Sequence, residues 1–302
     1  MIPNPVVPKL PARLRAPRLA LVVSLLALSL VSWQCAARLR TAAAGSLLEE
    51  MVAATNQQQD VDLVLQATPS YLLLLEGLRQ GDPHNNRLLL SLAQSYASYA
   101  ILVEIGDPAR AGELYRRAKD CGLQALRQRR RLALYLDAPF PEFSQIRAAL
   151  KPGDLEPVFW TALAWGAWIS THADSMAALS ELPKVVLMME WVVAQDETYQ
   201  NASPHVFLGV YHSAIPPALG GRPDRALQHF DRAGQLTQGR ALMVPVQKAR
   251  YYARQIFDRQ LYTALLLGVL AEQGECAPEL ALQNAAARRL ARKLLEETDA
   301  FF

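Results

Sequence analysis

Beyond roughly residue 40, the pattern of apolar and polar positions favours helices throughout. Ala111, Tyr115 and Ala118, for example, are spaced by four and then three residues, which places them on one face of a helix. No Asn-Gly or Asp-Gly dipeptide marks a hairpin, and no run of β-branched residues alternates with polar ones. We therefore predict an all-α fold.

Proline and glycine mark the predicted ends of these helices. A proline directly after a capping residue fits the first helical turn, where its missing N–H costs nothing. We expect helix starts at Thr68-Pro69, Asp107-Pro108, Ser203-Pro204 and Cys276-Ala277-Pro278. We expect helix ends at Gly81, Gly106, Gly239 and Gly274. The least regular stretch, Asp137–Pro157, has four prolines around one short predicted helix, and we interpret it as a linker or a lid.

An internal repeat indicates how the helices pair. Gly106–Ala118 aligns with Gly221–Ala233, and Tyr115 corresponds to Phe230. A small, an aromatic and a small residue on one face are typical of the second helix of a tetratricopeptide repeat (TPR). Because the two segments begin at 106 and 221, their separation is not a multiple of the ~34-residue TPR period, so the repeat is degenerate. The predicted units are about Arg87–Arg131, Val158–Asp196 and Pro204–Gln238.

The first residues of the chain predict export. Four basic residues precede the apolar run Leu19–Val31, and Cys35 follows it. A basic segment before an apolar run is typical of an export signal, and the run can be extended to Ala37, about the 20 residues of a membrane span. Cys35 stands where a lipoprotein cysteine is modified, although Ser32–Gln34 lacks the small residues that such a site prefers. Three outcomes stay open: lipidation of Cys35, an uncleaved anchor helix, and ordinary cleavage. Each places the body outside the cytoplasmic membrane, so we expect a signal or anchor at 1–35 and one helical-repeat domain at 36–302.

Charge and cysteine content exclude several classes of protein. The net charge of +3 comes from the leader, because beyond residue 35 there are 27 Lys and Arg against 28 Asp and Glu. A nucleic-acid partner is therefore not expected. Three cysteines cannot build a disulfide scaffold or a four-cysteine zinc site, and five scattered histidines do not predict a metal centre.

No catalytic motif is recognisable in the sequence, so we predict neither an enzyme nor a cofactor. His205 and His212 share a helical face but lie about 10 Å apart along its axis, and we interpret them as partly buried, hydrogen-bonded histidines. The densest basic cluster contains Arg116, Arg117, Arg127 and Arg129–Arg131. We interpret it as a solvated helix end, with an acidic protein or a lipid headgroup as the alternative partner.

Aromatic residues give the one candidate binding site. They fall on three predicted helices and on the loop that follows the third. The candidates are Trp160, Trp165, Trp168, Tyr96, Tyr99, Phe207, Tyr211, Ile215, Pro216 and Pro217. Core packing explains aromatics at helical spacing, but an apolar groove or cavity for a partner segment or an apolar ligand is the alternative.

An ordered set of motifs resembles a known family. The motifs are Asp82–Ala100, Phe159–Trp168, Leu182–Val185, Pro204–Tyr211, Pro216–Gly221, Tyr251–Gln255 and Phe301-Phe302. From about Asp60 to the end, their order resembles the T component of TRAP transporters, a bacterial helical lipoprotein family. The resemblance implies a periplasmic, TPR-like, non-enzymatic protein that works beside the substrate-binding subunit of a tripartite ATP-independent transporter. It supplies no catalytic residues.

The function expected from residues and resemblance together is that of a membrane-tethered adaptor. It would bind the periplasmic solute-binding protein of such a transporter and assist transfer of the solute, and it could form a homo-oligomer. The alternative is a periplasmic ligand-binding protein with an aromatic-lined apolar cavity.

Overall fold

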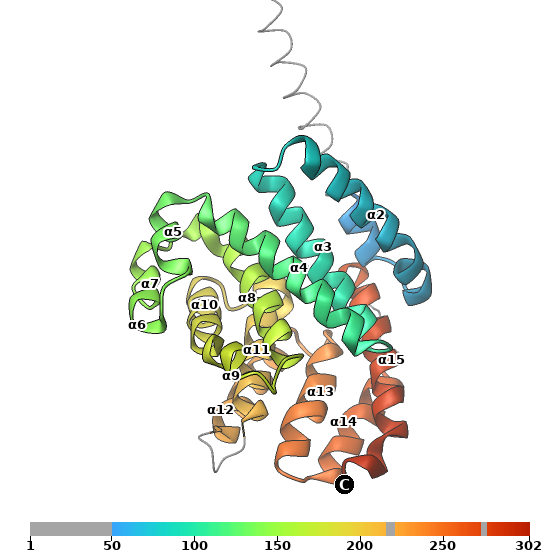
Figure 1. Cartoon of the computed structure of the whole chain (residues 1–302). Coiled ribbons are helices and arrows are strands. Elements are labelled where there is room, and N and C mark those ends of the chain that lie inside the picture. Colours follow the sequence, from blue (N-terminus) through green and yellow to red (C-terminus); the bar gives the residue numbers. More distant parts are fainter. Residues whose placement is uncertain (1–49, 216–220, 273–276) are drawn as a thin grey trace, which may run out of the picture. The chain divides into compact units, whose positions relative to one another are not determined.

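The computed structural model describes residues 50–215, 221–272 and 277–302 (Figure 1). The chain divides into two compact units, Met1–Ala53 and Ala54–Phe302, and every helix named below belongs to the second unit. The predictions for Cys35, Pro216, Pro217, Gly274 and Cys276 lie outside the described residues.

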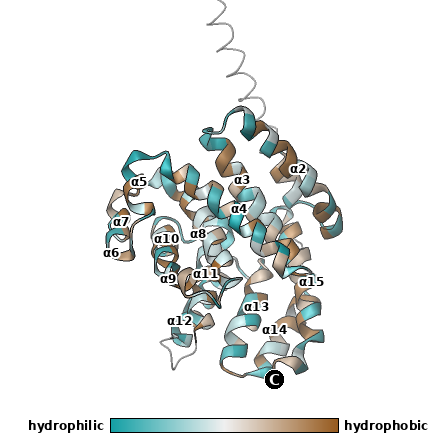
Figure 2. Ribbon diagram, in the orientation of Figure 1, coloured by the Kyte–Doolittle hydropathy of each residue, from teal (hydrophilic) through white to brown (hydrophobic). Residues whose placement is uncertain are grey.

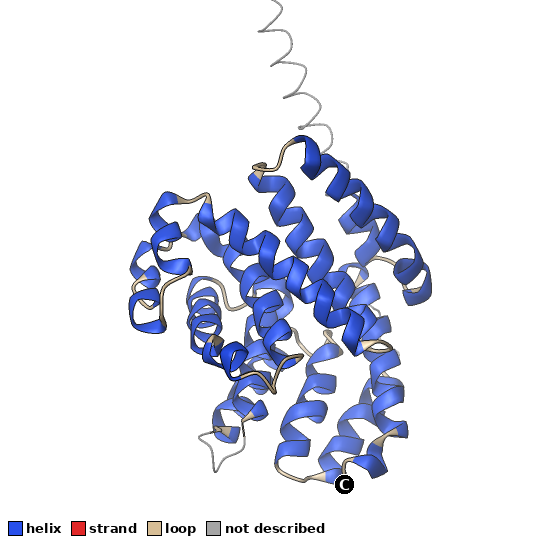
Figure 3. Cartoon of the chain, viewed as in Figure 1, coloured by secondary structure: helices blue, strands red, loops and turns tan. Residues whose placement is uncertain are grey.

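The second unit is built from helices, and its described residues contain no strand (Figure 3). The all-α prediction is therefore confirmed. In chain order the elements are α2 (Val61–Gly81), α3 (Asn86–Glu104), α4 (Pro108–Arg127), α5 (Arg130–Leu136), α6 (Phe140–Phe143), α7 (Ile146–Ala149), η2 (Pro152–Asp154), α8 (Leu155–Ser170), α9 (Met176–Ser180), α10 (Leu182–Gln195), α11 (Tyr199–Ala214), α12 (Pro223–Leu236), α13 (Met243–Gln247), the π-helix η4 (Lys248–Ala253), α14 (Arg259–Ala271), η5 (Pro278–Leu280), α15 (Ala281–Glu296) and η6 (Thr298–Ala300).

Side-chain caps explain where several helices begin. Asp60, Asn85 and Asp107 each accept a hydrogen bond from a backbone N–H in the first turn of α2, α3 and α4. The predicted start at Asp107-Pro108 is thus correct. The predicted start at Thr68-Pro69 is wrong, because Pro69 lies inside α2 and the Thr68 hydroxyl donates to the carbonyl of Val64 at 2.7 Å.

The helices pack as antiparallel hairpins at the predicted repeat units. α3 packs on α4, α8 on α10, and α11 on α12 (Figure 1). Tyr115 and Phe230, together with the alanines on either side of each, are buried. Phe230 lies against Gly209, where a Cβ atom would be 3.0 Å from the ring. Both aromatics are therefore core residues, which is consistent with the predicted repeat.

The stretch Asp137–Pro157 is neither a linker nor a lid. It forms the short helices α6 and α7 and the turn η2, and Phe143 and Ile146 are fully buried within it. The Asp154 carboxylate is also buried and pairs with Arg129 at 2.8 Å and with Arg131. Proline here marks a packed corner that the sequence pattern alone did not predict.

The first and last helices of the unit share a hydrophobic cluster. Val61 and Val64 of α2 belong to the same cluster as Tyr262 of α14 and Leu290 of α15. Asp62 also pairs with Arg289 at 2.5 Å. The first helix, α2, therefore contacts the last helices, α14 and α15, and connects the two ends of the array of hairpins.

Replacing Tyr115 or Phe230 with alanine should destabilise the protein by about 3–5 kcal/mol, because each change leaves a cavity in the core. Chemical denaturation followed by circular dichroism measures this loss. An exposed control such as Arg130→Ala should change stability by less than about 0.5 kcal/mol. A loss below roughly 1 kcal/mol at either aromatic would contradict the packing of that hairpin.

Candidate functional site

The structure divides the residues of the predicted groove by burial. Tyr96, Tyr99, Trp160 and Trp165 are buried in the core. The partly exposed members are Trp168, Phe207, Tyr211 and Ile215. Solvent therefore reaches mainly the end of α8 and one side of α11, and the groove hypothesis rests on these four residues.

Two of the predicted helices do meet. At Gly166 of α8, a Cβ atom would lie 2.4 Å from the ring of Phe207 of α11, so the absence of a side chain lets the ring pack against the α8 backbone. Tyr96 and Tyr99 are directed elsewhere. The Tyr96 hydroxyl donates to Glu76 of α2, and the Tyr99 hydroxyl accepts from Arg110 of α4.

The three tryptophans of α8 have different neighbours. Trp165 packs edge-on against Phe143, and Trp160 against Phe159. Trp168 is covered by the Lys119 ammonium, 3.7 Å from the ring centroid. Burial lowers the pKa of Lys119. A continuous aromatic wall is therefore not formed by these three rings.

A polar centre that the sequence analysis missed joins distant parts of the unit. Glu104 at the end of α3 accepts from Arg250 of η4 at 3.0 Å and from the Tyr115 hydroxyl at 2.8 Å. Burial, and then the charge of Glu104, raise the pKa of Tyr115 well above its ordinary value, so this hydroxyl stays a donor. The side chains of Arg250 and Glu104 keep 28% and 26% of their surface exposed. Water or a ligand therefore reaches part of the ion pair.

The helix that carries Arg250 has unusual backbone geometry. Lys248–Ala253 is a π-helix, a form that often occurs at functional sites. The side-chain carbonyls of Gln247 and Gln255, on either side of it, are buried with no hydrogen-bond partner. The hydroxyl of Ser213 and the indole N–H of Trp160 are also buried and unpartnered. Unpaired buried polar atoms are costly, so these four groups need a partner from solvent or from a bound molecule.

A second feature missed from the sequence is the outer face of α2. Nine of its residues share one helical face, all are exposed, and none is charged. They are Leu63, Gln66, Ala67, Ser70, Leu73, Leu74, Gly77, Leu78 and Gly81. Leu73 alone keeps 74% of its surface exposed, and Figure 2 shows long hydrophobic stretches along α2. We call this surface the α2 face. A continuous uncharged face of this length is typical of an interaction surface.

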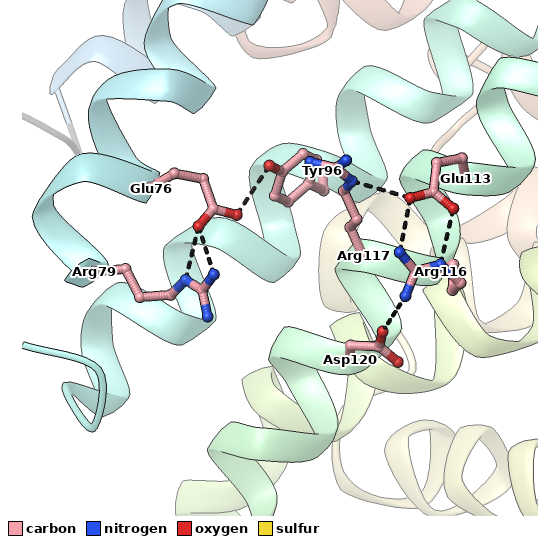
Figure 4. A network of polar contacts seen from close by, with 7 residues as sticks. All are labelled: Glu76, Arg79, Tyr96, Glu113, Arg116, Arg117 and Asp120. Atoms are coloured by element: carbon pink, nitrogen blue, oxygen red, sulfur yellow. Dashed lines mark hydrogen bonds and ion pairs between the residues drawn. The ribbon is translucent and has the colours of Figure 1, made fainter.

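A polar network holds α2 in place on its inner side (Figure 4). Glu76 of α2 accepts from the Tyr96 hydroxyl of α3 at 3.0 Å and pairs with Arg79 at 2.7 Å. The guanidinium of Arg117 of α4 lies 5.9 Å from the centroid of the Tyr96 ring. The network therefore connects three helices and fixes the orientation of the α2 face.

Most of the basic cluster is paired within the chain. Arg116 and Arg117 pair with Glu113, and hydrogen bonds from Arg116 are the main reason that the pKa of Glu113 falls to about 2. Arg127 pairs with Asp137 at 2.5 Å. Arg129 and Arg131 both pair with Asp154, so five of the six arginines of the cluster have a carboxylate partner, which leaves less charge for an acidic partner.

No three His, Cys, Asp or Glu side chains in the part of the chain that the structure describes are arranged to hold a metal ion. None of the helices in the same residues combines the length and apolar character needed to cross a membrane.

The structure is that of a helical-hairpin protein. Many of its charged side chains pair with one another, and its first long helix, α2, presents an uncharged face. The family follows from comparison. Residues 57–302 match the model of the TRAP transporter T-component family, so the chain belongs to that family. A search of curated proteins found no significant match. Membership supports an accessory role in a TRAP transporter and a location associated with the membrane.

The Glu104–Arg250 pair should show energetic coupling in a double-mutant cycle. We expect Glu104→Gln and Arg250→Met to be non-additive by about 0.5–3 kcal/mol, because either change alone leaves a poorly solvated charge. Urea unfolding of the four proteins measures it. The largely exposed pair Arg259–Asp299 is the control and should couple by less than about 1 kcal/mol. Equal coupling energies in the two pairs would show that the Glu104–Arg250 pair is as well solvated as the exposed Arg259–Asp299 pair.

Proposed function

We propose that this protein is a non-enzymatic accessory subunit that binds the solute-receptor subunit of a TRAP transporter and assists transfer of solute to the membrane permease. The family match over residues 57–302 is the observation that carries the proposal. The stack of helical hairpins supports it, because stacked helical hairpins present extended surfaces to protein partners.

The α2 face is the surface that we assign to the receptor. Burying a leucine side chain contributes about 1.5–3 kcal/mol, and four leucines stand on this face. No charged residue of the face has to lose its water when a partner binds. The network around Glu76 keeps α2 in one orientation, which reduces the entropy lost on binding. The fitting partner surface is an apolar patch, also poor in charge.

A tether to the membrane suits this role. The body follows an apolar segment and Cys35, and either a lipid on Cys35 or an uncleaved helix would hold it on the periplasmic side. Partners confined to one membrane meet at a high effective concentration, so a modest affinity of the α2 face is sufficient.

A second candidate function is direct binding of a small molecule. The buried, unpartnered polar atoms of Ser213, Gln247, Gln255 and Trp160 favour it, as does the partly exposed aromatic group on α8 and α11. Native mass spectrometry of the purified protein distinguishes this role from a pure adaptor, because a ligand appears as a discrete added mass.

Replacing Leu73 and Leu74 with serine should weaken binding of the purified receptor subunit about tenfold or more, since the change removes apolar area at the centre of the α2 face. Isothermal titration calorimetry measures the affinity. The matched control is Leu134→Ser with Met176→Ser, two equally exposed residues on α5 and α9, and should bind like wild type. Unchanged affinity of the α2 variant would move the docking surface elsewhere, whereas no binding by wild type would refute the adaptor role.

Cys35→Ala tests the tether. If a lipid on Cys35 holds the protein, the variant should leave the membrane fraction or accumulate as an unprocessed precursor, which cell fractionation and intact-mass measurement detect. Full membrane retention with an unchanged mass would favour an uncleaved anchor helix instead.

A further inference from the structure

Three histidines meet where α11 packs on α12. The Nδ1 atoms of His205 and His229 are 2.9 Å apart. The rings of His212 and His229 are stacked, with centroids 5.7 Å apart and planes 12° from parallel. His205 and His212 are buried, and His229 is half-buried. We call these three residues the histidine cluster.

One arrangement of protons satisfies the contacts of the cluster. The Nε2 atom of His205 lies 3.4 Å from Glu197, a carboxylate that can only accept, so Nε2 carries the proton of His205. Its Nδ1 is then an acceptor, and His229 donates to it from its own Nδ1. Glu197 is in turn fixed by Arg232 of α12. These contacts form one polar chain. It runs from Arg232 of α12 to Glu197 before α11, then to His205 of α11, and returns to α12 at His229.

Burial keeps the cluster neutral. Burial lowers the pKa of His205 and His212, and it lowers the pKa of His229 to about 4, with the neighbouring histidines and Arg225 adding to the effect. Arg222 and Asp224 at the start of α12 also act on His212. Towards η4, Asp231 of α12 is paired with Lys248 at 2.7 Å.

A strained turn adjoins the cluster. Gln200, Asn201 and Ala202 have φ angles of 48°, 56° and 59°, a left-handed conformation that residues with a Cβ adopt at an energetic cost. The turn lies between Glu197 and His205, the two residues that the polar chain connects. The Ala202 N–H donates to the carbonyl of Thr198 at 3.1 Å, and Ala202 is buried. Such strain persists only where surrounding contacts hold it, and the buried Ala202, which belongs to one hydrophobic cluster with Ala233 of α12 and Val244 of α13, supplies contacts of this kind.

We propose that this region is an acid-sensitive joint: proton uptake by the histidine cluster separates α12 from α11 and lets the left-handed turn at Gln200–Ala202 relax. This conformational change is additional to the proposed adaptor role. A doubly protonated imidazole has only donors. Once His205 and His229 are both charged, their Nδ1 atoms therefore repel each other and the 2.9 Å contact cannot persist.

The direction of the pH effect follows from the lowered pKa values. We call the joint closed when α12 packs on α11 and open when the two helices have separated. In the open state the histidines titrate near the ordinary value of 6.5, and in the closed state their pKa values are lower, down to about 4 for His229. Between these values the open state binds more protons, so acidification favours opening. The closed joint is fully stable above about pH 6.5 and weakens progressively as the pH falls toward about 4.

Hydrogen–deuterium exchange of the full-length protein, corrected for intrinsic rates, tests the proposal. Between pH 7.5 and 5.0, protection of α11 and α12 should fall about tenfold or more, while that of α14 and α15 stays constant. His229→Asn keeps an N–H donor for His205 but cannot titrate, so it should lose much less protection on acidification. His84→Asn, an exposed histidine outside the cluster, should behave like wild type.

Two results would overturn the joint. One is protection of α11 and α12 that does not change with pH in wild type. The other is an equal loss of protection in His229→Asn. If that variant does not fold, NMR titration of the five histidines in wild type decides instead. Three of them must titrate clearly below 6.5, and five ordinary titrations would contradict the proposal.

Discussion

The fold depends on how closely its helices approach one another. At Gly122 of α4, a Cβ atom would lie 2.3 Å from the Thr161 hydroxyl of α8 and 3.1 Å from the Thr161 Cα. At Gly166, the same atom would overlap Phe207. These absent side chains let successive hairpins stack, and aromatic residues fill the spaces beside the contacts. The α2 face and the histidine cluster lie on helices that this packing holds in place.

The sequence predicted the elements that depend on local pattern. The Ala–aromatic–Ala spacing identified two hairpins and their buried aromatics because residues that share a helical face are set by helix geometry alone. The misplaced start of α2 has a local cause too. Pro69 resembles a first-turn proline, but Asp60 caps the helix nine residues earlier and the shared core with α14 and α15 favours the longer helix.

The parts that the sequence did not predict depend on tertiary contacts. Glu104 and Arg250 are 146 residues apart, and no spacing rule connects them. The aromatic candidates lie in different surroundings for the same reason. Periodicity shows which residues share a face of α3 or α8, but the neighbour that covers that face is decided by packing. The uncharged face of α2 was visible in the sequence, although only the structure shows that no described helix covers it.

The join between the first and last helices has a consequence for how the chain folds. Asp62 and Arg289 are 227 residues apart, and the cluster around Tyr262 contains residues from both ends of the unit. Contacts of such long sequence separation form late, because the whole intervening chain has to be ordered first. A chain still emerging from the ribosome therefore holds α2 without α14 and α15, so that Val61 and Val64 as well as the α2 face are uncovered. Until the last helix arrives, that segment is the part of the molecule most exposed to misassociation.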